Sequence, residues 1–76
     1  MEKLLKILKD IKPEVDFEKE TDLIGRSILT SFDIIRLVME ISNEFDIEVS
    51  PLYIVPENFS SAQKIMELIE KIEEEE

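Results

Sequence analysis

Ser31 is the residue of this sequence whose setting best suits chemistry. It follows Thr30, whose hydroxyl can accept a hydrogen bond from an orphan backbone N–H and so cap a helix. Asp33 stands where its carboxylate can reach back to the N–H of the cap, which makes Thr30-x-x-Asp33 a variant of the capping box. Ser31 would then be exposed at the first helical position, where the helix dipole favours negative charge. This position suits a phosphoester on the serine hydroxyl.

The composition excludes most other chemistry. The chain contains no histidine and no cysteine, which excludes a histidine general base, thiolate metal sites and disulfides. No Gly-x-Ser-x-Gly motif is present, and no lysine stands near Ser31 in the sequence to activate it. Asp46 and Glu48 could hold a divalent cation weakly, but no calcium-loop spacing is present. We therefore expect neither an enzyme nor a metal site.

The segment from Ser31 to about Asp46 is predicted to be a helix with two apolar stripes. One stripe would face the core and consists of Ile34, Leu37, Val38, Ile41 and Phe45. The second stripe, displaced by roughly a third of a turn, consists of Phe32, Ile35 and Met39. It is either more core or a partner surface. We favour a partner surface, because Phe32 follows Ser31 directly and methionine adapts to several partners.

Charged residues on the same helix and just after it would surround the second stripe. The acids are either a solvated face or charge offered to a partner, and they are Asp33, Glu40, Glu44, Asp46 and Glu48. Arg36 interrupts them, and it can pair with Asp33 or Glu40 along the helix or select against partners that expect an acid there. The predicted contact surface consists of Thr30, Phe32, Asp33, Ile35, Arg36, Met39 and Glu40.

A longer pattern surrounds the serine. It consists of Ser31-Phe32-Asp33, the helical run Leu37-Val38-Met39-Glu40, the stretch from Asn43 to Val49, Thr21-Asp22-Leu23-Ile24, and Pro56-Glu57-Asn58-Phe59. With this pattern the chain resembles an acyl carrier protein, and more narrowly the free-standing carriers that include D-alanine carrier proteins. The resemblance covers most of the chain, from about Leu23 to Ile69.

The resemblance implies a function for Ser31. In that family the serine carries 4'-phosphopantetheine, donated by coenzyme A, and the thiol of this arm holds an acyl or aminoacyl group as a thioester. The implied partners are a phosphopantetheinyl transferase and acyl- or aminoacyl-activating and transferring enzymes with basic surfaces. Two positions depart from the family, since Thr30 replaces the usual Asp and Ser27 stands nearest the usual glycine. Thr30 keeps the capping role but removes a carboxylate that would help to engage the transferase.

The charge of the chain supports an alternative function as well. Nine Lys and Arg against nineteen Asp and Glu give a formal net charge of -10, which argues against nucleic acid or anionic lipid and favours basic protein surfaces. The alternative is an unmodified helical interaction domain that binds a basic partner through the second helix. No segment is long enough to cross a membrane and none resembles a signal peptide, so we expect a cytoplasmic monomer.

The rest of the sequence predicts one small all-α domain over residues 1–76. A first helix from Met1 to Lys12 would be stopped by Pro13. A long ordered loop would follow to Leu29, with Gly25 in a turn that needs a positive φ. Ser50 would cap a short helix from Pro51 to about Val55, and Pro56 would end it before a turn that buries Phe59.

The last helix is predicted from the Ser60-x-x-Gln63 capping box to about Ile72. Its buried stripe would consist of Ala62, Ile65, Leu68, Ile69 and Ile72. The acidic tail of residues 73–76 is expected to fray, because the dipole disfavours acids at a helix C-terminus. These segments predict a small antiparallel four-helix bundle with three longer helices and one short helix, and the resemblance implies the acyl-carrier type.

Overall fold

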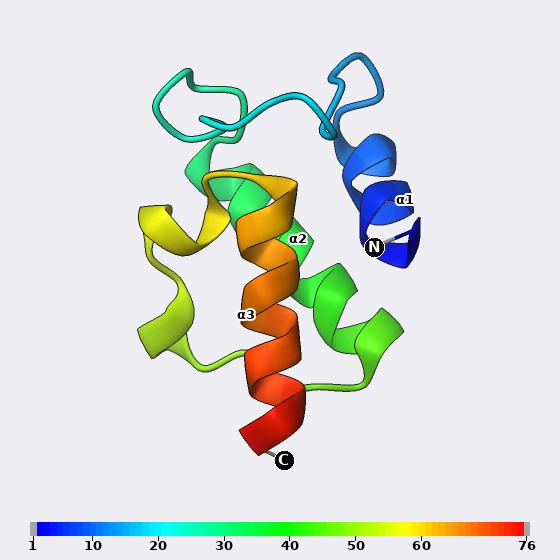
Figure 1. The fold of residues 1–76 in the computed structure, drawn as a ribbon, viewed down its shortest axis with the longest axis vertical. Helices are drawn as coiled ribbons and strands as arrows, with labels where there is room; N and C mark the ends of the chain where they lie inside the picture. The colour runs from blue at the N-terminus through cyan, green and yellow to red at the C-terminus, as the bar shows by residue number, and fades with distance from the viewer. Residues whose placement is uncertain (1, 76) are drawn as a thin grey trace.

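A computed structural model describes residues 2–75, which contain helices and no strands (Figure 1). The elements in chain order are α1 (Glu2–Ile11), α2 (Ser31–Phe45), the 3-10 helices η1 (Pro51–Tyr53) and η2 (Pro56–Phe59), and α3 (Ala62–Glu75). The prediction of a small helical bundle is confirmed, although two 3-10 helices replace the single short helix. The predicted start at Met1 lies outside the described residues. None of the described helices is long and apolar enough to cross a membrane.

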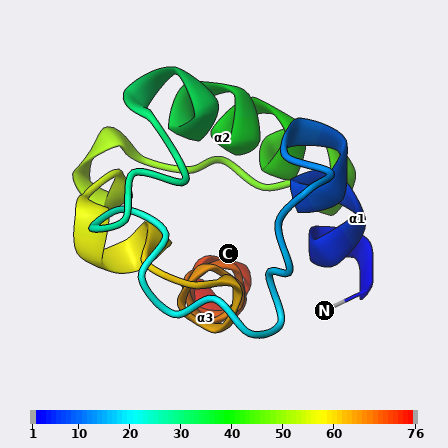
Figure 2. The ribbon, with the colours of Figure 1, turned by 90° about the horizontal axis from the view of Figure 1, so that it is seen from above.

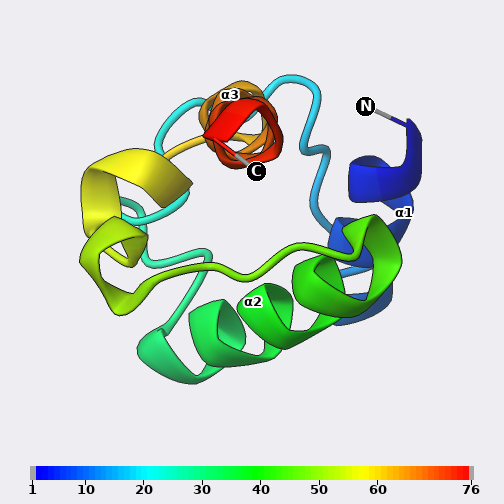
Figure 3. The same ribbon diagram turned by 90° about the horizontal axis from the view of Figure 1, so that it is seen from below.

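The elements surround a core, with α3 across from α2 (Figures 2 and 3). α1 lies beside the later part of α2, and the 3-10 helices lie towards its beginning. α2 and α3 run in the same sense and α1 runs opposite to both (Figure 1). The bundle is therefore only partly antiparallel, because the segment from residue 46 to residue 61 carries the chain back along the length of α2.

Each long helix buries apolar side chains on one side. α1 buries Leu4, Ile7 and Leu8, and α2 buries Leu37 and Ile41. The buried residues of α3 are the predicted stripe of Ala62, Ile65, Leu68, Ile69 and Ile72. The long loop adds Phe17, Leu23 and Leu29, and η2 adds Phe59. Burial of these side chains explains why a loop of this length is ordered in a small domain.

The prediction of a positive φ at Gly25 is wrong. Among the described residues the left-handed positions are Ser27, with φ 58°, and Asp46, with φ 52°. The Gly25 N–H donates to Asp22 Oδ1 at 3.0 Å, and a Cβ on Gly25 would collide with that carboxylate. Glycine is therefore used here for a close approach, and the left-handed turn falls two residues later.

The beginning of α3 also differs from the prediction. The Lys64 N–H donates to Ser61 Oγ at 3.1 Å, which makes Ser61 the cap. The Ser60 hydroxyl instead donates to the Glu57 carbonyl at 3.1 Å. The predicted capping box at Ser60 and Gln63 is therefore wrong by one residue, because η2 uses the Ser60 hydroxyl.

α3 continues past Ile72 to Glu75, so the acidic residues 73–75 belong to the helix instead of a frayed tail. The Tyr53 hydroxyl donates to Glu75 Oε1 at 2.7 Å. That hydrogen bond to Glu75 raises the pKa of the Tyr53 hydroxyl above 10.0. A contact across the molecule therefore joins the last turn of α3 to η1. Glu76 lies outside the described residues.

Candidate functional site

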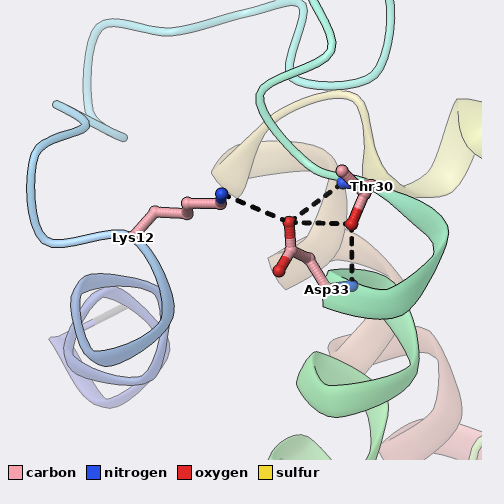
Figure 4. A network of polar contacts seen from close by, with 3 residues as sticks. All are labelled: Lys12, Thr30 and Asp33. Carbon is pink, nitrogen blue, oxygen red and sulfur yellow. Dashed lines mark hydrogen bonds and ion pairs between the residues drawn. The ribbon is translucent and has the colours of Figure 1, made fainter.

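The capping box at the beginning of α2 is formed as predicted (Figure 4). Thr30 Oγ1 accepts from the Asp33 N–H at 3.2 Å. Asp33 Oδ2 accepts from the Thr30 N–H and from the Thr30 hydroxyl, each at 3.0 Å. Thr30 has an extended backbone, with φ -91° and ψ 172°, so the helix begins at Ser31 without a distorted first turn.

Lys12 joins this network from the end of α1. Its Nζ lies 3.6 Å from Asp33 Oδ2, and the two side chains are largely covered. The Thr30 N–H lowers the pKa of the Asp33 carboxyl below its ordinary 3.8, and the Thr30 hydroxyl and Lys12 act in the same direction against the opposing effect of partial burial. The sequence does not predict this role of Lys12, because the pairing depends on how the long loop brings α1 to α2.

Ser31 is exposed at the first position of α2. Its hydroxyl makes no hydrogen bond to any other residue in the range 2–75. The capping hydrogen bonds join Thr30 and Asp33, which lie before and after Ser31 in the sequence, and they do not involve the Ser31 hydroxyl. The predicted placement of Ser31, exposed at a helix start, is confirmed.

Ser31 lines an apolar groove of about 300 Å³. Ile34 and Ile35 of α2 form one wall, and the opposite wall comes from the segment around η2. The residues of that segment are Ile54, Val55, Pro56 and Phe59. The sequence does not predict Ile54 or Val55 at the site, because both lie more than twenty residues after Ser31 and reach the groove only through the fold.

The second apolar stripe of α2 is exposed. Phe32, Ile35 and Met39 are 76%, 60% and 63% exposed, so the alternative that they are core is wrong. We call these three residues the outward stripe. Leu52 of η1 is also exposed, and the sequence analysis did not identify it as a surface residue. Exposed apolar side chains next to one another are typical of a surface that another molecule covers.

Glu40 lies against α1, away from the outward stripe. It lines a cavity of about 120 Å³ together with Glu44 and with Lys3, Lys6 and Asp10 of α1. Glu40 Oε2 is buried there without a hydrogen-bond partner. The Lys3 ammonium donates to the Glu44 carbonyl oxygen at 2.8 Å. α1 therefore covers the side of α2 that carries its acids.

One of the two roles predicted for Arg36 was pairing with Asp33 or Glu40, and the structure shows no such ion pair among residues 2–75. The ion pair of Asp33 is with Lys12, and Arg36 has no ion pair within residues 2–75. Its side chain is exposed next to the outward stripe. Of the predicted contact residues, the structure thus brings Phe32, Ile35, Met39 and Arg36 together.

The described residues contain no cluster of three acidic side chains able to hold a metal ion. The arrangement offers one free hydroxyl, an apolar groove that begins beside it and an exposed apolar stripe. It suits attachment of a group and contact with a partner. A comparison of the chain with protein families, curated proteins and solved structures finds no match.

Proposed function

We propose that this protein is an acyl carrier, in which Ser31 bears 4'-phosphopantetheine and the arm holds an acyl or aminoacyl group as a thioester. The observation that supports this most is the exposed Ser31, whose hydroxyl has no partner among residues 2–75 and which lines an apolar groove. The chain itself performs no chemistry in this proposal. It presents a tethered group at high effective concentration to successive enzymes.

The surroundings of Ser31 fit such an arm. The serine is exposed and its hydroxyl is free of other bonds among the described residues, so a bulky phosphodiester meets no obstacle there. A phosphodiester anion is also favoured at the first turn of a helix. The groove walls are apolar apart from Ser31, which suits the aliphatic part of a carried group. The thiol of the arm would supply the thioester chemistry.

Modification is a phosphoryl-type transfer to the serine. The bond from Ser31 Oγ to phosphorus forms as the pyrophosphate bond of coenzyme A breaks, and adenosine bisphosphate leaves. The proton of the serine hydroxyl passes to a base of the transferase, because no neighbouring side chain of this protein accepts it within the described residues. The capping network contributes by fixing the first turn on which Ser31 stands.

The backbone at Ser27 is compatible with the proposal. Ser27 stands nearest the place of the usual glycine of the family, and it has a left-handed φ of 58°. Glycine adopts such angles without steric cost, whereas other residues rarely do.

Intact mass tests the proposal. The purified chain is incubated with coenzyme A, magnesium and a phosphopantetheinyl transferase, first a broad-specificity one and then one from the native host. We expect one phosphopantetheine on the wild type and none on Ser31→Ala, with equal helicity for both. An unmodified wild type with both transferases would overturn the proposal and favour the alternative of an unmodified interaction domain.

A further inference from the structure

Resting on the proposed carrier function, we infer that the enzyme that modifies Ser31 docks on the outward stripe through an apolar surface that carries an acidic side chain opposite Arg36. The acidic composition of the whole chain suggests the reverse, a basic docking surface. The distribution of charge around α2 decides between the two.

The acids of α2 are turned towards α1. At about 100° per residue, Asp33, Glu40 and Glu44 lie roughly 80–120° around the helix from Phe32. The structure shows what they meet there. Asp33 lies 3.6 Å from the ammonium of Lys12. Glu40 and Glu44 line a cavity with Lys3, Lys6 and Asp10 of α1.

Of these acids, Asp33 has little charge left for a partner at Ser31. Asp33 accepts two hydrogen bonds from Thr30 besides its ion pair with Lys12. Its side chain is only 15% exposed. Opposite charges in close proximity cancel most of each other's field at a distance. The carboxylate nearest to Ser31 on α2 is therefore neutralised within the molecule.

The outward stripe carries the opposite sign. Arg36 lies roughly 40° around the helix from Phe32, and Met39 lies roughly 20° from it on the other side. The Arg36 guanidinium is exposed and has no ion pair within residues 2–75. Arg36 thus lies at the edge of the outward stripe, about midway around the helix between Phe32 and Glu40, and it is the charged group of α2 nearest to the stripe.

An enzyme that reaches Ser31 must cover this surface, because Phe32 and Ile35 lie within one turn of the serine. Covering an unpaired guanidinium is costly unless a carboxylate meets it, and arginine binds carboxylates through two parallel hydrogen bonds. A lysine or arginine at the same place would add repulsion. The chemistry that fits is therefore an apolar surface with an acid.

The test is the KM of the host transferase for four versions of the chain, at saturating coenzyme A and an ionic strength of about 0.15 M. They are wild type, Arg36→Glu, Arg36→Lys and Lys9→Glu. Lys9 is exposed on α1 and lies outside every ion pair in residues 2–75, so Lys9→Glu makes the same change in net charge away from the stripe. Thermal melting checks that all four fold alike.

We expect Arg36→Glu to raise KM about tenfold, and Arg36→Lys to raise it less, because lysine keeps the charge but loses the two parallel hydrogen bonds. Lys9→Glu should stay within about twofold of wild type. A lower KM for Arg36→Glu, as a basic partner would cause, overturns the inference. So does an unchanged KM, or an equal rise for Lys9→Glu. If the wild type is modified and the variants give any of these results, the docking inference alone is overturned. If the wild type takes no phosphopantetheine, the carrier function and the inference are overturned together.

Discussion

The two sides of α2 use their side chains for different purposes. On the side towards α1, Asp33 lies 3.6 Å from the ammonium of Lys12, which directly follows α1, and Glu40 lines a small cavity with Lys3 and Lys6 of that helix. The outward side exposes the apolar stripe of Phe32, Ile35 and Met39 to water. Besides the apolar side that it buries in the core, α2 therefore has a second apolar side that is exposed, which an ordinary surface helix lacks.

The difference indicates which side of α2 would supply most of the free energy of binding to a partner. Burial of exposed apolar area against a partner lowers the free energy of the complex by about 25 cal/mol per Å². Acids that already face lysines gain little from a new partner. A carrier with this arrangement would bind through the stripe, and its total charge of -10 would act mainly on encounter rates.

The largest expected effect is a difference in the free energy of unfolding between variants at Leu37 and Met39, which lie on opposite sides of α2. Leu37 is fully buried, so Leu37→Ala should lower the free energy of unfolding by about 2–5 kcal/mol. Met39→Glu should change it by less than about 0.5 kcal/mol, because Met39 is 63% exposed. Urea denaturation measures both. Met39→Glu should nevertheless raise the KM of the transferase, and a large loss of stability in this variant would show that Met39 contributes to the core.

The next effect is the difference in stability between losing the Thr30 cap and losing the neighbouring Ser31 hydroxyl. Thr30→Ala removes a hydrogen bond to the Asp33 N–H and should destabilise the protein by about 1 kcal/mol. Ser31→Ala is the matched control, one residue along, and should leave stability within about 0.5 kcal/mol. Thermal melting of both variants measures the difference. Equal losses would mean that the Ser31 hydroxyl supports the fold and is not free for modification.

Local spacing in the sequence predicted much of α2 and α3. The capping box depends on residues three positions apart, and the stripes of α2 and α3 depend on helical periodicity, so these features were visible in the sequence. The error of one residue at the cap of α3 arose because adjacent serines, Ser60 and Ser61, can each cap a helix. Only the structure shows that Ser60 bonds to η2 instead.

The features that the sequence did not predict depend on contacts between distant segments. Lys12 meets Asp33 only because the loop returns the chain beside α1. Ile54 and Val55 reach the groove at Ser31 only because the chain folds back along α2. The end of α3 is held by Tyr53 of η1. Periodicity describes which side of a helix is apolar, but it does not say which neighbour covers the other sides.

The smallest effect concerns pH and the side of α2 that faces α1. The folded-state pKa of Asp33 lies below its ordinary value, so its contribution is fully present above about pH 4 and is lost as the pH falls through that lower pKa. Asp33→Asn should therefore destabilise the protein more at neutral pH than near pH 3. Urea denaturation at both pH values measures the difference from wild type. Ser31→Ala, which removes no titratable group, should follow the wild type at both. An equal loss for Asp33→Asn at the two pH values would mean that the Thr30 cap accounts for the role of Asp33 without its charge, and the lysine-facing side would then be no more electrostatic than the outward stripe.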